Sequence, residues 1–377
     1  MKFKTHTRTL VALGIISAAS AVVAEETATP LLTALSATTL SGYVDTSAIW
    51  LFGTGNSLPG RSFDGSDKQD GFNLNVVSLA IEKPLDEAAW SAGYRAQLLF
   101  GPDANTLGSL STLGSASGDF AIKNAYVTLR APVGDGLTLK LGVWDTIMGY
   151  EVFEAGNNPN YSRSYGYYIE PIIHTGVLVS YTFADWLTVS GGIADGGGKN
   201  NINFRTPVES LLSYVASIAL TAPESAGFLK GATLYAGVMD SGIAGAKDMV
   251  NLYLGATFPT PLTGLSVGVA YDYRANGLFD RSYENAAGGY LSWQATEKLK
   301  LHGRAEYATG SNGAYGFTQD GHTELFGLTA TVDYRLWANA ITRLEFRWDK
   351  DLSGDGQFLD GTKENAASLA LNVIYKF

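Results

Sequence analysis

The chain has 377 residues, no cysteine and a formal net charge of −10, with 36 Asp and Glu against 26 Lys and Arg. The acid excess argues against a nucleic-acid partner, and the lack of cysteine excludes disulfides and thiolate metal sites. The length suits either two ordinary soluble domains or one large all-β barrel.

Residues 1–24 have the pattern of a secretory signal peptide. A basic start is followed by a run of apolar and small residues, and Val22 and Ala24 occupy the small-residue positions before the cleavage site. A membrane anchor is the alternative, but the apolar run is shorter than the ~20 residues that a spanning helix needs. Cleavage after Ala24 would leave a net charge of −13, a short periplasmic segment at 25–39 and a barrel domain at 40–377.

Short segments of alternating apolar and polar residues recur along the rest of the chain. In 340–349, apolar residues alternate with charged ones, so one face of that strand must meet water. A change of parity at Val76 and Val77 predicts a β-bulge. The alternation predicts about 16 strands, near 40–52, 72–83, 90–101, 119–130, 137–144, 175–184, 186–194, 211–221, 229–240, 249–258, 265–275, 284–295, 298–309, 323–335, 339–350 and 364–377.

The connections between these segments alternate in length. Short connections occur at Pro84, 131–136, 184–185 and 336–338, and long ones at 53–71, 102–118, 145–174, 310–322 and 351–363. An even number of strands with long outer loops and short periplasmic turns is typical of an outer-membrane barrel. The sequence therefore predicts an all-β fold, a transmembrane antiparallel β-barrel in the bacterial outer membrane.

Aromatic residues lie near the ends of the predicted strands, as in the interfacial girdles of membrane barrels. Ordinary core aromatics are the alternative interpretation. The girdle candidates are Trp50, Phe52, Trp90, Phe100, Trp144, Phe183, Trp186, Phe258, Trp293, Trp337, Trp348 and Phe377. The last strand ends on Phe377 itself, so we expect it to pair with the first strand and close the barrel.

Four stretches resemble the OmpL-like β-barrel porins of Gram-negative-type bacteria: SGYVDTSAIW (41–50), GYRAQLLFGPDAN (93–105), NAYVTLRAP (124–132) and GVWDTIMGYEVFEAGNNPNYSRSYGYYIEPIIHTG (142–176). The resemblance covers essentially the whole mature chain and is sharpest over 142–176. It implies an outer-membrane channel surrounded by lipid and lipopolysaccharide. It also implies that the outer-membrane assembly machinery recognises the terminal strand through Phe377, and that the chain forms a homotrimer.

A barrel of about 16 strands is wide enough for a water-filled channel, so something must narrow it. The third outer loop, 145–174, is the longest connection, and we expect it to fold into the lumen as the third loop of general porins does. Opposed charges there would create a transverse field that orients solutes and sets ion preference, although they could also only solvate a wet lumen. The residues expected at the constriction are Asp145, Glu151, Glu154, Arg163 and His174 from the loop, and Arg95, Arg304, Arg343 and Arg347 from the strands.

The same loop carries Tyr161, Tyr165, Tyr167 and Tyr168. These rings could form a stacking surface for sugars. The favoured interpretation is that they hold the loop against the barrel wall, because a phenol supplies both apolar packing and a hydrogen bond.

The stretch DKDLSGDGQFLD (349–360) matches part of a calcium-loop pattern. Against a calcium site, position twelve is Asp rather than the longer Glu, the first acid still belongs to a strand, and no helices flank the loop. Bound Ca²⁺ and an ordinary acidic turn are both kept as hypotheses, and no other cofactor is expected. The candidate ligands are Asp349, Asp351, Ser353, Asp355 and Asp360.

The sequence contains no recognisable enzyme motif. The mature histidines, His174, His302 and His322, have no nucleophile beside them in a known arrangement, and GGGKN (196–200) lacks the spacing of a phosphate loop. We therefore expect a porin for passive diffusion of small polar solutes and ions, and not an enzyme. The alternative is a non-conducting barrel with a structural or adhesive role for its outer loops, in which 145–174 plugs the lumen.

Overall fold

The computed structural model describes residues 37–52, 68, 70–107, 118–195, 202, 211–242, 248–276, 282–311, 314–316, 322–354, 356, 358 and 362–377. The signal peptide expected at 1–24 and most of the segment expected at 25–39 lie outside these residues. In the described part of the chain, no helix has both the length and the apolar character needed to cross a membrane.

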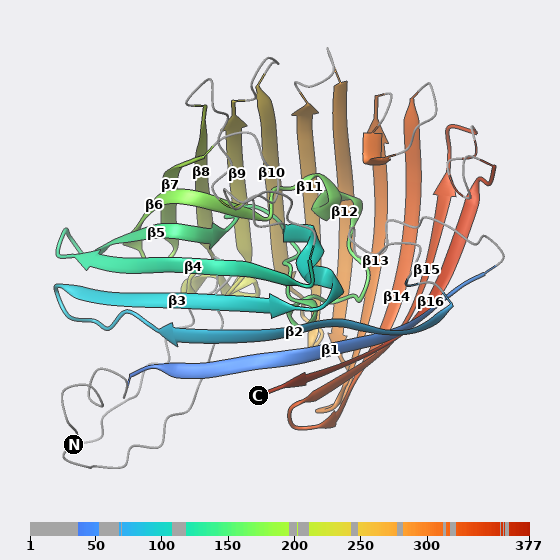
Figure 1. Cartoon of the computed structure of the whole chain (residues 1–377), viewed down its shortest axis with the longest axis horizontal. Helices are drawn as coiled ribbons and strands as arrows, with labels where there is room; N and C mark the ends of the chain where they lie inside the picture. The colour runs from blue at the N-terminus through green and yellow to red at the C-terminus, as the bar shows by residue number, and fades with distance from the viewer. Residues whose placement is uncertain are drawn as a thin grey trace.

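Sixteen strands form one closed antiparallel barrel, in which consecutive strands pair and β1 also pairs with β16 (Figure 1). The strands are β1 (Thr39–Leu51), β2 (Gly71–Lys83), β3 (Ser91–Phe100), β4 (Phe120–Ala131), β5 (Leu137–Asp145), β6 (Ile173–Ala184), β7 (Leu187–Asp195), β8 (Leu212–Thr221), β9 (Thr233–Ser241), β10 (Met249–Pro259), β11 (Leu265–Asn276), β12 (Ser282–Gln294), β13 (Leu299–Gly310), β14 (Thr323–Trp337), β15 (Ala340–Asp351) and β16 (Asn365–Lys376). The short helices are η2 (Pro102–Leu107), η3 (Ala155–Asn157), α2 (Tyr165–Ile169), η4 (Glu224–Leu229) and η5 (Ala314–Gly316).

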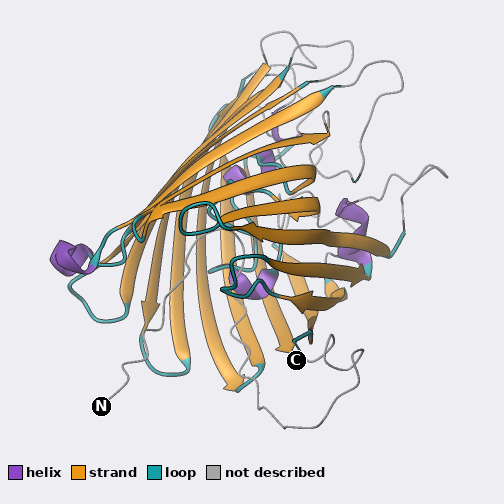
Figure 2. Cartoon of the chain, turned by 90° about the vertical axis from the view of Figure 1, so that its left-hand side faces the viewer, coloured by secondary structure: helices purple, strands orange, loops and turns teal. Residues whose placement is uncertain are grey.

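The predicted barrel and its sixteen strands are confirmed. The largest displacement is at β9, which begins at Thr233 instead of 229 because Glu224–Leu229 forms η4 in the preceding turn. Figure 2 shows the strands inclined to one another around the barrel, as closure of a sheet requires.

The barrel closes at the last residue of the chain. The backbone N–H of Gly42 donates to the carbonyl oxygen of Phe377 at 2.9 Å, and the N–H of Phe377 donates to the carbonyl oxygen of Gly42 at 3.0 Å. The aromatic ring of Phe377 lies so close to Gly42 that a Cβ there would be 2.6 Å from the ring. Glycine therefore allows the terminal aromatic to cover the seam between β1 and β16.

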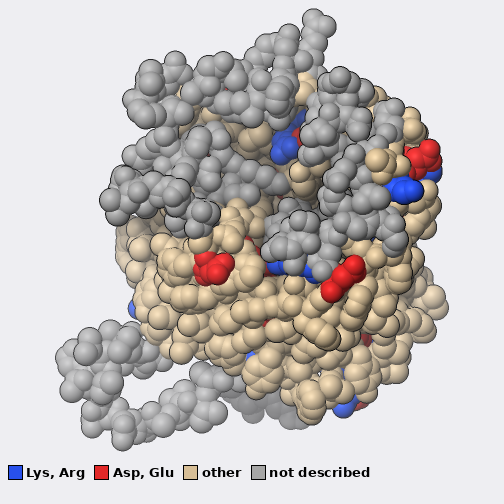
Figure 3. Space-filling model, turned by 45° about the vertical axis from the view of Figure 1, so that its right-hand side comes forward, with Lys and Arg blue, Asp and Glu red and all other residues tan. Residues whose placement is uncertain are grey.

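The two faces of the strands differ in chemistry, as the alternation predicts. In β15, Leu344 and Phe346 are 47% and 46% exposed, whereas Arg343, Glu345 and Arg347 are at most 3% exposed. A closed barrel turns one face toward lipid and the other toward its interior, so the charges lie inside. The described surface in Figure 3 is accordingly mostly uncharged.

Most of the girdle candidates are exposed, but the prediction is wrong for Trp144. Its side chain is completely buried, and its ring lies 4.7 Å from the ring of His174 on the neighbouring strand. Trp144 belongs to an interior cluster with Met148 and Leu178. An aromatic residue near a strand end is therefore not always part of the girdle. It can be buried when the segment that follows the strand packs over it.

The predicted bulge in β2 is present, one residue earlier than expected. Asp45 pairs with Val76 and Thr46 pairs with Leu74, so Asn75 is the extra residue. Its side chain is buried and donates to Oδ1 of Asp45 at 3.0 Å. The bulge thus brings an amide into the polar interior of the barrel.

Candidate functional site

Residues 146–172, hereafter the 146–172 segment, connect β5 and β6 and include η3 and α2. The N–H of Thr146 donates to the carbonyl oxygen of Ile172 at 2.9 Å, so the two ends of the segment meet as a hairpin base. Between these ends the chain leaves β5 and β6, and α2 packs against β11, β12 and β13 (Figure 1). The segment is three residues shorter than the predicted loop because β5 ends at Asp145 and β6 begins at Ile173.

The first part of the segment rests on glycines of the β9–β12 wall. A Cβ on Gly237 would be 2.5 Å from the side chain of Met148, and a Cβ on Gly268 would be 2.0 Å from the hydroxyl of Tyr150. The ring of Tyr150 also stacks on the ring of Tyr290 at 3.9 Å. Because Gly237 in β9 and Gly268 in β11 have no side chain, they leave space in which Met148 and Tyr150 lie.

The later part of the segment is held by arginines of β15. Arg343 donates to the carbonyl oxygens of Ala155 at 2.7 Å and Asn158 at 2.8 Å. Arg347 donates to the carbonyl oxygen of Arg163 at 2.7 Å. Both guanidinium groups thus satisfy backbone carbonyls of an irregular segment that has no sheet partner of its own.

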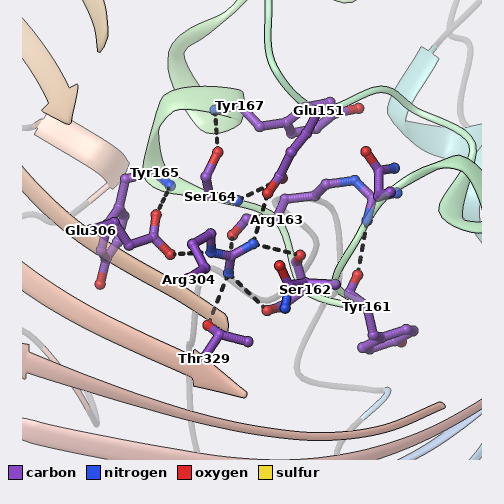
Figure 4. Close-up of polar contacts among 12 residues, drawn as sticks. Glu151, Tyr161, Ser162, Arg163, Ser164, Tyr165, Tyr167, Arg304, Glu306 and Thr329 are labelled. Atoms are coloured by element: carbon purple, nitrogen blue, oxygen red, sulfur yellow. Dashed lines mark hydrogen bonds and ion pairs between the residues drawn. The ribbon is translucent and has the colours of Figure 1, made fainter. Parts of the chain in front are cut away.

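Arg304 of β13 makes the densest set of contacts with the segment (Figure 4). It donates to Glu151 at 2.8 Å and lies 2.7 Å from Glu306 on its own strand. It also donates to the carbonyl oxygen of Ser162 at 2.9 Å and to the hydroxyl of Thr329 at 3.1 Å. Its side chain is completely buried, so the two carboxylates supply the compensating charge.

Acidic residues of the wall complement these arginines by accepting N–H groups of the segment. Glu345 accepts from the N–H of Tyr161 at 2.5 Å and of Ser162 at 2.8 Å. Glu306 accepts from the N–H of Tyr165 at 2.6 Å. Arginines and glutamates of β13 and β15 therefore match the carbonyl and N–H groups of one short stretch.

The tyrosines of the segment are anchors. Tyr161, Tyr165 and Tyr167 are at most 3% exposed, so they offer no surface for sugars, and that interpretation is wrong for these three rings. Tyr161 donates its hydroxyl to Ser47 at 3.0 Å, and Tyr165 donates to Asp349 at 2.6 Å. Burial raises the pKa of the Tyr165 phenol well above its ordinary value, so the hydroxyl keeps the proton that it donates.

The calcium hypothesis has no support from the described residues. The carboxylate of Asp349 is bound by Arg347 at 2.8 Å and by the Tyr165 hydroxyl, and it is completely buried. Asp351 accepts from the N–H of Ser353 at 2.9 Å and thereby shapes the turn. Asp355 and Asp360 lie outside the described residues, and within the described ranges no cluster of three or more acidic or histidine side chains could hold a metal ion.

The residues predicted for the constriction fall into two groups. Glu151, Arg163, His174, Arg304, Arg343 and Arg347 are at most 4% exposed and contact protein. Asp145 and Glu154 border the first cavity, and Arg95 pairs with Glu82. Glu151 and Arg343 also border the two cavities, so charges that hold the segment lie beside charges that solutes can reach.

Lys123 is a functional candidate that the sequence did not reveal. Its buried ammonium group pairs with Asp145, and it lies 3.7 Å from Glu154. The register between β3 and β4 shifts beside it, and this shift adds Lys123 to the inner face. In the sequence, only a break in the alternation of apolar and polar residues within 119–130 could have indicated that Lys123 faces inward.

Two adjoining cavities border the segment. The first has a volume of about 550 Å³ and extends to hydroxyl-bearing side chains of β7 and β8. The second has a volume of about 560 Å³ and extends to the turn-side ends of β11, β12, β13 and β14. The residues that line both cavities are Gly149, Tyr150, Asn157, Tyr235 and Tyr253.

Glu170 and Asp272 join the end of α2 to β11. The two carboxyl groups hydrogen-bond to each other, and the side chains are 5% and 4% exposed. Two carboxyl groups can bond in this way only when they share one proton. Glu151 adds further negative charge near Asp272, so loss of the shared proton would leave like charges in a buried site.

The comparisons with known proteins agree with the barrel. The family model described as "Putative beta-barrel porin-2, OmpL-like" matches residues 37–377. No curated protein sequence matches the chain significantly.

Solved structures of outer-membrane proteins share the fold at low sequence identity. The outer membrane channel DcaP of Acinetobacter baumannii has a TM-score of 0.61 and 13% identity, covering 90% of this chain and 97% of that chain. The anion-selective porin from Comamonas acidovorans has a TM-score of 0.58 and 14% identity, covering 90% of this chain and 99% of that chain. The trimer form of OmpT from Vibrio cholerae has a TM-score of 0.57 and 13% identity, covering 90% of this chain and 99% of that chain.

Proposed function

Because the chain belongs to the OmpL-like family of β-barrel porins, which are outer-membrane channels and not enzymes, we propose that it conducts small polar solutes and ions by passive diffusion. The observation that carries this proposal is the pair of adjoining cavities, about 550 Å³ and 560 Å³, beside the 146–172 segment. Their linings include hydroxyl, amide and charged side chains, so they would hold water.

We further propose that the 146–172 segment narrows the lumen. It is attached to the β9–β12 wall through Met148 and Tyr150, and to the β13–β15 wall through Arg304, Arg343 and Glu345. A segment fixed on both sides would be a permanent constriction with no hinge of its own. The accessible charges at its edge, Asp145 and Glu154 beside Lys123, would set ion preference.

A non-conducting barrel is the second candidate. The observation that favours it is the dense burial of the segment, in which Arg163, Tyr165 and Asn160 are completely buried. A segment packed in this way could plug the lumen, leaving the outer loops to provide a structural or adhesive role.

Single-channel recording of the purified protein in a planar lipid bilayer separates the two candidates. We expect discrete current steps whose size scales with salt concentration, and a reversal potential under a salt gradient that reports the accessible charges. Heat-modifiable mobility in gel electrophoresis would verify that the barrel is folded. A folded barrel that gives no steps would refute the channel and support the plugged barrel.

We also propose that the outer-membrane assembly machinery recognises the terminal strand. Phe377 is 49% exposed and its backbone completes the seam with Gly42. Deleting Phe377 removes both backbone bonds of this pair, and we expect about a thirtyfold loss of folded barrel in the outer membrane, since two hydrogen bonds contribute about 1 kcal/mol each. Quantifying heat-modifiable barrel in membrane fractions tests this, with Phe377→Tyr as the control that keeps a terminal aromatic. Equal yields for the deletion and the control would contradict the proposal.

We propose a homotrimer as the assembled state. OmpT from Vibrio cholerae, which shares the fold, has been solved in a trimer form. Crosslinking of the protein in intact membranes, followed by mass determination of the extracted complex, tests the stoichiometry.

A further inference from the structure

We propose that Tyr150, Tyr235 and Tyr253, hereafter the tyrosine junction, form a binding site for neutral polyhydroxylated solutes of the carbohydrate class. This inference deepens the proposed channel function and rests on it. The site lies where the two cavities adjoin, so a solute in either cavity can contact these rings.

The residues at the junction are uncharged. The 146–172 segment contributes Tyr150 and Asn157, and the wall contributes Tyr235 from β9 and Tyr253 from β10. A ring presents an apolar face to the C–H face of a sugar, and its phenol and the Asn157 amide supply hydrogen bonds to sugar hydroxyls. A charged solute would instead lose its hydration without gaining a partner of opposite charge at this point.

The charges near the junction are already engaged with protein groups. Glu151 is bound by Arg304 at 2.8 Å, and Asp145 is bound by Lys123. Lys376 donates to the Asn157 side chain at 3.0 Å. The residues that line both cavities carry no charge themselves, so stacking and neutral hydrogen bonds are the interactions that the junction offers.

Hydroxyl groups extend the site in both directions along the wall. Thr188, Ser190 and Ser217 line the first cavity, and Thr257 and Ser266 line the second. Hydroxyls both donate and accept, so they can exchange partners with successive sugar hydroxyls as a solute moves. Each cavity also falls within the ~300–1,000 Å³ of typical small-molecule sites.

The rings are held in place before any solute arrives. Tyr150 stacks on Tyr290 at 3.9 Å and lies over the bare backbone of Gly268. Tyr253 is only 6% exposed, so it offers little open ring surface and mainly supports the site, whereas Tyr235 is only partly buried. A preorganised aromatic surface loses little side-chain entropy on binding. Tyr235 is consequently the position where a substitution tests the site with the least effect on packing.

Maltose added to the planar bilayer tests this site. We expect a saturable reduction of current, and about a fivefold weaker apparent affinity in Tyr235→Ala, the size of one aromatic contact. Tyr235→Phe should stay within about twofold, because it keeps the ring. Tyr271→Ala is the matched control, since it removes a ring that is 43% exposed on the outward face of β11. Polyethylene glycol of similar size should reduce the current without saturation.

Calorimetric titration of maltose into the folded, detergent-solubilised barrel measures binding independently of conduction. Current steps without saturable maltose binding, or equal affinities in Tyr235→Ala and the parent, would overturn the tyrosine junction but keep the channel. Calorimetric binding that weakens in Tyr235→Ala, in a protein that gives no current steps, would keep the site and refute diffusion. The failures of the two proposals are therefore distinguishable.

Discussion

Replacing residues 148–170 by a short Gly-Ser turn is expected to raise single-channel conductance severalfold and to leave the barrel closed. Residues just outside the excised stretch are already adjacent, because the N–H of Thr146 bonds to the carbonyl oxygen of Ile172 at 2.9 Å. Asp145 and Ile173 pair directly below them. A short turn can therefore join β5 and β6 as an ordinary hairpin, and a barrel of this size without its obstruction is an open aqueous channel.

The charges exposed by this excision should be tolerated. Arg304, Arg343 and Glu345 are buried against the segment in the native protein, but they would face water once it is removed. Hydration then replaces the lost partners, so the variant avoids the cost of an unpaired buried charge. Salt-dependent single-channel recording gives the conductance. Shortening η4 (Glu224–Leu229) at a turn is the matched control, and it should leave the conductance unchanged. Equal conductance in the excised and native proteins would mean that the segment does not narrow the lumen.

The barrel was predictable because its signals are local. Alternation in each strand reports which side chains face lipid, and β15 shows this directly, with Phe346 exposed and Arg347 buried. The alternation of short and long connections between the strands indicates the antiparallel topology. Trp144 shows the limit, because its burial depends on residues that the chain contributes only after the strand has ended.

The candidate site was harder because its contacts join residues far apart in the sequence. The sequence indicated that Arg304, Arg343 and Arg347 lie inside, but alternation cannot tell whether an inner charge meets water or a backbone carbonyl. Likewise, the calcium pattern grouped Asp349 with the acidic residues that follow it in the chain. Its carboxylate is bound instead by Arg347 and by Tyr165, which is distant in the sequence.

The rings at the cavity junction were missed for a related reason. Tyr150, Tyr235 and Tyr253 come from three different elements, and nothing in any one of them predicts that they meet. A signal was nevertheless present in the wall. Gly237 and Gly268 lie on the inner face of strands, where a side chain would normally stand, and such gaps indicate that another part of the chain approaches closely.

Arg304→Leu is expected to lower the free energy of unfolding by about 3–5 kcal/mol, the cost of breaking a buried ion pair from one side. The guanidinium of Arg304 lies between Glu151 at 2.8 Å and Glu306 at 2.7 Å, and all three side chains are at most 1% exposed. Removing it leaves the Glu151 carboxylate buried without its cationic partner. Urea denaturation of the folded barrel in lipid vesicles measures the change.

A double variant decides whether this loss comes from charge or from packing. Arg304→Leu combined with Glu151→Gln removes the unpaired charge and keeps an acceptor for the N–H of Ser164, which now donates to Glu151 at 2.8 Å. Glu306 would keep Arg347, which lies 3.7 Å away. We therefore expect the double variant to be more stable than Arg304→Leu alone. Lys300→Leu, on the same strand but lining the second cavity, should change stability by no more than about 0.5 kcal/mol. A double variant that is less stable than Arg304→Leu would mean that removing the Glu151 charge has no stabilising effect. Arg304 would then act through packing and hydrogen-bond geometry.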